Sequence, residues 1–232
     1  MPATDYPEEL MPDSMTPAAP GLPEAAYRVT SHELLALLSF DRSAGTALTR
    51  RVLGLADLPE DHDLVRAGIG TLNIRDAVEI RGEQVTLLAQ AQVFARILAT
   101  SSQWFDITRI GPDSVSPSYV VDSPVGRAAI LLRPLSEYVC IPLRDDVDLF
   151  DFVESTVDEA AASMAAAAEG IVTSRRYRGT ADPIVANLKA QKSGSFQLAA
   201  PPLDDQGQLS VRDLATSERP GRVVRETLAV TQ

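Results

Sequence analysis

Three arginines lie close together in the second half of the chain and offer its clearest potential for binding chemistry. They are Arg175, Arg176 and Arg178, in a segment with the composition of a β-strand. On a strand, Arg176 and Arg178 share one face and Arg175 lies on the other. Guanidinium groups bind carboxylates through paired hydrogen bonds. We predict that these arginines contact an acidic partner or the chain's own acidic segments; the alternative is that they protect an edge strand from pairing.

The residue types needed for nucleophilic catalysis are scarce in this chain. It contains one cysteine, Cys140, and two histidines, His32 and His62. Ser–His and Cys–His arrangements therefore have few available members. A single thiol also excludes an internal disulfide and a zinc site built from cysteines. Because Cys140 lies in an apolar run, we expect it to be a small buried residue on a strand.

Three segments resemble functional motifs superficially. The acidic neighbours of His62 point in different directions on a helix, so these three residues cannot converge on one metal ion without further ligands from elsewhere in the chain. Gly68 and Gly70 lack the preceding strand of a dinucleotide-binding loop, and Asn73 replaces its third glycine, so close helix packing explains them better. The acids between Asp145 and Glu159 are most simply a solvated helix face. We predict no metal site, no cofactor and no catalytic residue.

Composition and charge narrow the class of protein. The chain has 232 residues, 45% hydrophobic and 23% charged, which is typical of a globular protein. Its net charge of −11 disfavours binding to nucleic acid and to anionic membranes. No apolar run approaches the ~18 residues of a membrane-spanning helix. The N-terminus lacks the basic and apolar regions of a signal peptide. We therefore expect a cytoplasmic protein.

An acidic, proline-rich segment precedes the part expected to fold. Residues 1–26 contain six prolines and five acids, with no Lys or Arg. Such a segment has little apolar surface to offset the entropy lost on ordering. We predict a disordered tail over residues 1–27 and a single domain over residues 28–232, which could be subdivided near residue 169.

The first half of this domain has the patterns of helices and a hairpin. Thr30 and Glu33 form a capping box at the start of an apolar helix. In a later helix, the positions Val93, Phe94, Ile97 and Leu98 predict one buried face. That helix is expected over 90–101, and the other expected elements are helices over 43–53 and 61–72 and a hairpin over 78–87.

The second half is dominated by short strands. Gly and Pro turns separate four runs, over 105–110, 118–121, 128–133 and 138–143, which predict an antiparallel meander. A long helix over 146–168 follows, with apolar residues at steps of three and four. Strands are then expected over 171–177, 195–198, 209–211 and 222–224. This segregation predicts the α+β class, with an antiparallel or mixed sheet flanked by helices.

The helices and hairpin of residues 31–88 have the outline of a winged helix. Its third helix would be the recognition element, but it supplies only Arg66 and Arg75 against three nearby aspartates. Such a surface contacts phosphates poorly. A transcription regulator with a winged-helix-like N-terminal region and an α+β sensor region is kept as the alternative function.

The order of these elements resembles a known family. A helix and short hairpin over 72–82, the meander run Asp122-Ser123-Pro124-Val125-Gly126-Arg127, a long Ala-rich helix and a second set of strands follow one another. The chain resembles, over residues 28–228, the EspG family of cytoplasmic chaperones of actinobacterial type VII secretion. The resemblance implies a mixed sheet, no catalytic site, and binding to the helical tip of a secreted PE/PPE-type pair. We therefore expect a non-enzymatic adaptor or chaperone that binds a partner protein.

Overall fold

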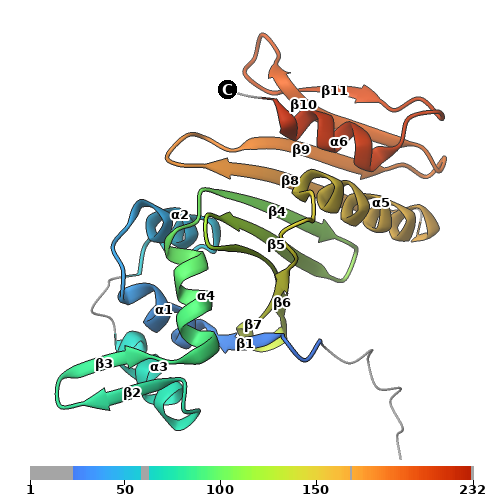
Figure 1. Ribbon diagram of the computed structural model, residues 1–232. Coiled ribbons are helices and arrows are strands. Elements are labelled where there is room, and N and C mark those ends of the chain that lie inside the picture. Colours follow the sequence, from blue (N-terminus) through green and yellow to red (C-terminus); the bar gives the residue numbers. More distant parts are fainter. Residues whose placement is uncertain (1–22, 59–62, 168, 231–232) are drawn as a thin grey trace, which may run out of the picture.

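The computed structural model describes residues 23–58, 63–167 and 169–230, which fold as an α+β structure. A nine-stranded sheet with helices on both faces forms its centre, and a separate two-stranded hairpin lies beside the helices of the N-terminal half (Figure 1). Every strand pair is antiparallel. This confirms the predicted class. The two strand-rich portions of the sequence share one continuous sheet.

The large sheet consists of two meanders joined by their first strands, with β1 at one outer edge. Its order is β1-β7-β6-β5-β4-β8-β9-β10-β11. The first meander comprises β4 (Gln103–Ile110), β5 (Val115–Ser123), β6 (Gly126–Arg133) and β7 (Glu137–Leu143), with the short 3₁₀ helix η1 (Pro134–Ser136) before β7. The second comprises β8 (Ile171–Arg178), β9 (Ile184–Ala190), β10 (Phe196–Leu203) and β11 (Leu209–Asp213). The predicted four-strand meander is therefore confirmed.

The helices form two groups that cover opposite faces of the sheet, one group near each end of it. Trp104 and Phe105 are neighbours on β4, both fully buried, and they belong to different hydrophobic cores. Since successive strand residues point to opposite faces, the two cores lie on opposite faces. One contains α1 (Ser31–Ser39), α2 (Ala44–Val52), α3 (Asp63–Ile74) and α4 (Ala89–Ala99); the other contains α5 (Leu149–Ala167) and α6 (Pro220–Ala229).

Local signals start several of these helices where the sequence predicts them. The Thr30–Glu33 capping box is present at α1, and the Ser43 side chain caps α2. The long helix α5 begins at Leu149, not at residue 146, because an Asp148 carboxylate oxygen accepts hydrogen bonds from two backbone N–H groups of its first turn. The predicted hairpin is confirmed as β2 (Val78–Arg81) and β3 (Gln84–Leu87).

Three elements differ from the sequence expectations. The segment 222–224, expected to be a strand, lies in α6, where Pro220 occupies the first turn and Val224 and Leu228 are fully buried four residues apart. Strand β9 was not predicted, although its buried residues alternate. Strand β1 (Tyr27–Thr30) starts inside the segment expected to be a tail, and pairs with β7. Residues 1–22 of that segment lie outside the described residues.

The acidic face of α5 is partly covered rather than wholly solvated. Arg219, next to the start of α6, lies 2.6 Å from the Asp158 carboxylate, and the Asp158 side chain also accepts a hydrogen bond from the backbone N–H of Gly221. Arg225 lies 3.0 Å from Asp151 and 3.3 Å from Glu154. These contacts hold α6 against α5, on the face of the sheet that these two helices cover.

Gly68 is the point of closest approach between α3 and α1. A Cβ atom added to Gly68 would lie 2.0 Å from the His32 carbonyl oxygen, so only glycine fits there. The predicted close helix packing is thus confirmed at Gly68. It is wrong for Gly70, where no atom lies within 4 Å of an added Cβ. His62, whose acidic neighbours suggested a metal cluster, lies outside the described residues.

The two glycines of α3 provide a matched test of this packing. We expect Gly68→Ala to lower the free energy of unfolding by about 2 kcal/mol, because the new methyl group overlaps a backbone carbonyl. Gly70→Ala, at an exposed helical position on the same helix, should raise it by up to about 1 kcal/mol. Urea unfolding curves of both variants measure the difference, and equal values would show that the close contact is absent.

Candidate protein-binding groove

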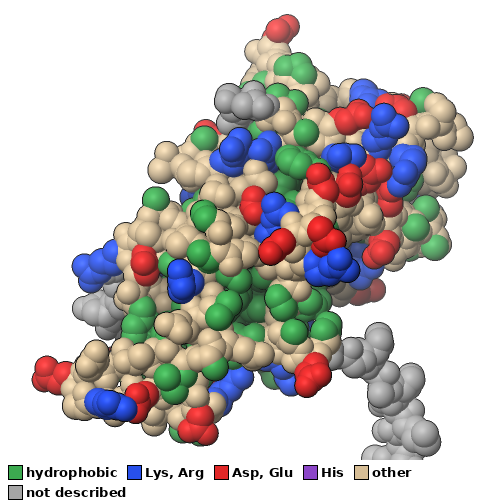
Figure 2. Space-filling view, viewed as in Figure 1, with side chains coloured by type: hydrophobic (Ala, Val, Ile, Leu, Met, Phe, Trp, Pro, Cys, Tyr) green, Lys and Arg blue, Asp and Glu red, His purple; other side chains and the backbone are tan. Residues whose placement is uncertain are grey.

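An open apolar groove lies between α4 and the sheet. It has a volume of about 500 Å³, and its floor is formed by Ala128 of β6 and by Cys140 and Pro142 of β7. Ala25 and Tyr27 close one end. Figure 2 shows hydrophobic side chains gathered over this part of the molecule. The remaining lining residues are on α4: Ala89, Gln90, Gln92, Val93, Phe94 and Ile97.

The helix α4 presents a row of apolar side chains to this groove. Ala89, Val93 and Ile97 are spaced four residues apart, so they lie above one another on the helix surface. Ile97 is buried, whereas 58% of Val93 is exposed. The sequence predicted that Val93 is buried together with Phe94, Ile97 and Leu98. That prediction is wrong for Val93, because α4 rests on the sheet with one flank only.

The floor of the groove is chemically inert. Cys140 lies opposite Tyr27 of β1 and Ile130 of β6 in the sheet register, and only 2% of it is exposed. Burial raises the pKa of its thiol far above the ordinary value, so the sulfur stays protonated near neutral pH. The prediction of a buried strand cysteine is therefore confirmed.

The end of the groove is formed by the aromatic ring of Tyr27. Its centroid lies 5.9 Å from that of Phe94, and the Arg75 guanidinium lies 5.9 Å from the Tyr27 ring centroid. Burial is the main cause that raises the pKa of the Tyr27 hydroxyl. Among the described residues this hydroxyl has no hydrogen-bond partner. Both titratable groups of the groove, Tyr27 and Cys140, are thus neutral near pH 7.

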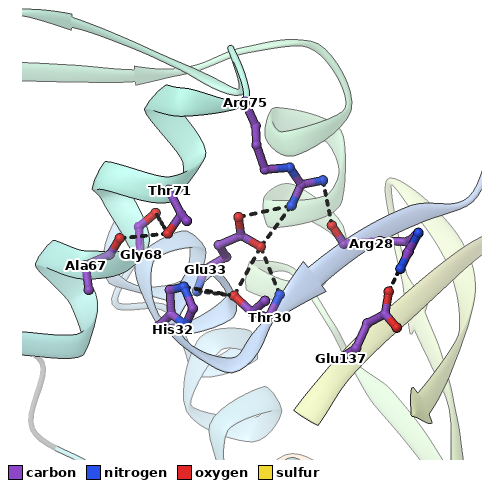
Figure 3. Close-up of polar contacts among 9 residues, drawn as sticks. All are labelled: Arg28, Thr30, His32, Glu33, Ala67, Gly68, Thr71, Arg75 and Glu137. Carbon is purple, nitrogen blue, oxygen red and sulfur yellow. Dashed lines mark hydrogen bonds and ion pairs between the residues drawn. The ribbon is translucent and has the colours of Figure 1, made fainter. Parts of the chain in front are cut away.

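An ion pair between the buried Glu33 carboxylate and the partly exposed Arg75 holds β1, and with it this end of the groove, in place (Figure 3). The Glu33 side chain is 1% exposed and accepts hydrogen bonds from Arg75 Nη1 at 3.0 and 2.9 Å and from the Thr30 backbone N–H at 2.9 Å. Arg75 Nη2 donates to the Arg28 carbonyl oxygen at 2.9 Å. One guanidinium therefore joins the end of α3 to the start of α1 and to β1.

The groove is suited to contact with apolar surface. Apart from Tyr27 and Cys140, its polar side chains are the two glutamines of α4, which are uncharged. Acid–base chemistry requires titratable groups whose environments separate their pKa values. In the groove, both titratable groups are held neutral instead. Among the described residues, no group of three or more His, Cys, Asp or Glu side chains could hold a metal ion.

The three predicted partner-binding arginines lie away from this groove, on β8. Strand β8 pairs with both β4 and β9, so it is central, and the edge-strand interpretation is wrong. Arg175 lies 2.8 Å from the buried Asp106 carboxylate. Arg176 is buried on the opposite face, where it contacts α6, and Arg178 is exposed. The three side chains alternate between the two faces of the strand, as predicted. Their binding to a partner stays a prediction.

The two arginines near the third helix, which a winged helix would use on DNA, are held by carboxylates. Arg66 forms an ion pair with Asp63 one turn earlier. Arg75 is bound to Glu33 as described above. The exposed surface of α3 includes the apolar side chains of Leu64 and Ile74, and 80% of Ile74 is exposed. This surface offers little to a phosphate backbone.

The fold and the groove together define the class: an α+β protein with a helix-flanked apolar groove beside an antiparallel sheet. Among solved structures, the chain is similar to the Mycobacterium tuberculosis type VII secretion system chaperone EspG5, solved in complex with the PE25–PPE41 dimer. The TM-score is 0.50 at 12% sequence identity, over 88% of this chain and 94% of that chain. This likeness shows the fold alone. No family model matches the chain, and no curated protein matches it.

The described helices include none that is both long and apolar enough to cross a lipid bilayer.

Loss of the Arg75 guanidinium should destabilise the end of the groove. We expect Arg75→Met to lower the free energy of unfolding by about 2 kcal/mol, because it leaves the buried Glu33 carboxylate without its cation. The value is moderate because 41% of the Arg75 side chain is exposed. Arg66→Met, which breaks an exposed pair on the same helix, should cost less than about 0.5 kcal/mol. If thermal unfolding showed similar losses of stability for the two variants, Arg75 would not be the cation that stabilises the buried Glu33 carboxylate.

The thiol of Cys140 should be unreactive in the folded protein. In the unfolded chain, the thiol ionises increasingly between pH 7 and 8.5, because its ordinary pKa is about 8.5. The raised pKa of buried Cys140 keeps the folded thiol protonated over this range. An aromatic disulfide reagent should therefore label the one cysteine only after guanidinium unfolding. Rapid labelling of the native protein would show that the floor of the groove opens to solvent.

Proposed function

We propose that this protein is a cytoplasmic, non-enzymatic chaperone or adaptor that binds a helical partner protein in the groove between α4 and β1–β7–β6. The observation that carries the proposal is the apolar groove with the exposed Val93 side chain on its rim. Val93 lies in a row of apolar α4 residues, and this row offers an unpaired helix face to an incoming helix.

The chemistry of the groove selects the kind of partner. Its lining is apolar or uncharged, so a charged partner segment would lose hydration there without gaining an ion pair. An amphipathic helix docks in such a groove through its apolar side chains, spaced three and four residues apart. The two rim glutamines, Gln90 and Gln92, supply hydrogen bonds at its polar margin. We therefore assign the groove to the apolar face of a partner helix.

The likeness to EspG5 supports a particular class of helical partner. EspG5 was solved in complex with the PE25–PPE41 dimer, and the two folds correspond over most of both chains. The element order of the sequence resembles the same family independently of the structure. On these two grounds we propose a PE/PPE-type pair of a type VII secretion system as the partner. The role of the protein is then to keep that pair soluble before its export.

An engineered charge in the groove tests this function directly. The wild-type chain should form a stable complex with at least one PE/PPE-type pair of its source organism on co-expression and size-exclusion chromatography. Val93→Glu should weaken that complex at least about tenfold, because docking would bury an unpaired carboxylate. Isothermal titration calorimetry measures the change in Kd.

Val115→Glu is the matched control for this experiment. Val115 is 65% exposed at the start of β5 and is not part of the groove lining, so its variant should bind like the wild type. Equal weakening by the two substitutions would move the binding surface away from α4. Failure of every PE/PPE-type pair to bind the wild-type protein would overturn the proposed partner class.

A further inference from the structure

A second, smaller pocket lies on the other face of the sheet, where β8 ends beside the end of α6. Its volume is about 250 Å³. The position of Arg176 shows which face of the sheet the pocket lies on. Arg176 pairs with Phe105 of β4 in the sheet register and contacts the core that contains α5 and α6. The pocket is therefore separate from the α4 groove. It is lined by Arg176, Arg178, Ala181, Asp182, Ile184 and Val230.

Arg176 is a buried cation without a carboxylate partner in the described part of the chain. Only 7% of Arg176 is exposed. Its Nε donates to Gln103 Oε1 at 2.8 Å, and Nη1 donates to the Leu228 carbonyl oxygen at 2.7 Å. The guanidinium also lies 5.1 Å from the Phe150 ring centroid. These neutral groups satisfy Nε and Nη1, but among the described residues none compensates the positive charge.

A second guanidinium increases this excess of positive charge. Arg178 is two residues further along β8, so it lies on the same face of the sheet as Arg176. Burial, and then the charge of Arg178, lower the pKa of Arg176 from its ordinary value. Asp182 also lines the pocket, but neither arginine forms an ion pair with it among the described residues.

Arg176, which lines this pocket, has hydrogen-bonding capacity that no described residue uses. Nε and Nη1 have the partners described above, while Nη2 has no hydrogen bond to any described residue and is not enclosed. Its two N–H groups, with those of Arg178, form a donor set suited to a planar or tetrahedral oxyanion. Ala181, Ile184 and Val230 supply an apolar wall beside these donors.

We propose that this pocket binds a small free oxyanion, a carboxylate or phosphate, that carries a short apolar group. The two guanidinium groups neutralise and hydrogen-bond the oxyanion, and the apolar group contacts Ile184 and Val230. The Asp182 carboxylate opposes the ligand charge and limits its affinity. This site is independent of the partner-binding groove and of the type VII secretion assignment.

Anion titrations of the full-length protein test the proposal. Inorganic phosphate, acetate and butyrate are added at constant ionic strength, with chloride as the reference, while amide resonances of β8 and of residues 181–184 are followed by NMR. We expect saturable shifts at these residues, and butyrate should bind about threefold more tightly than acetate, because its extra methylene groups contact the apolar wall. Phosphate binding without carboxylate binding would identify a phosphate site, and the reverse result a carboxylate site.

Arg178→Gln is the variant that distinguishes a site from general charge attraction. It should weaken binding about tenfold, because one charge-assisted contact is lost. Arg133→Gln is the matched control, since Arg133 is also an exposed arginine at the last position of a strand, β6. Asp182→Asn should tighten binding about threefold by removing the opposing charge.

Three results would overturn the proposal. They are the absence of saturation with all three anions, equal weakening by Arg178→Gln and Arg133→Gln, and, where carboxylates bind, butyrate binding no tighter than acetate. None of these results depends on whether a partner protein binds at Val93. The two functions of the molecule can therefore fail separately.

Discussion

The architecture depends on the pairing of β4 with β8 at the centre of the sheet. Trp104 on β4 packs into the core beneath α1–α4, and the next residue, Phe105, packs into the core beneath α5 and α6. One strand therefore serves two hydrophobic cores on opposite faces. Their partners on β8 follow the same alternation: Tyr177 lies opposite Trp104, and Arg176 lies opposite Phe105. The groove and the arginine pocket consequently face opposite sides of the molecule.

The position of β1 is fixed by the hydrogen bonds and the ion pair of the buried Glu33 carboxylate. The pairing of β4 with β8 does not determine this position. A buried carboxylate such as Glu33 is stable only with good hydrogen bonds and a nearby cation. Its contacts to Arg75 and to the backbone of Thr30 meet this requirement. They bring together segments 42 positions apart in the sequence, so the edge strand β1 is held at both the helix and the sheet. The capping box therefore has a tertiary role as well as a local one.

Local patterns predicted much of the fold, whereas long-range pairing was beyond them. The Thr30–Glu33 box, the turns of the first meander and the apolar period of α5 all act within a few residues. The helix α6 was mistaken for a strand because its segment 222–224 is too short to separate the two periods. The arginine cluster was found in the sequence, but the central position of β8 depends on pairing with β4. The groove joins α4 to strands from three other segments, so no local signal could locate it.

The same central pairing has a consequence for how the chain acquires its structure. The ion pair between Asp106 and Arg175 joins residues 69 positions apart, whereas neighbouring strands within each meander are joined by short turns. Closing a long loop costs more chain entropy than forming a hairpin, so meanders form more readily than the seam between them. During synthesis, the first meander emerges from the ribosome before β8 does, because β7 ends at Leu143 and β8 begins at Ile171. Until β8 pairs with it, one edge of β4 has unpaired backbone N–H and C=O groups, which can pair with another chain.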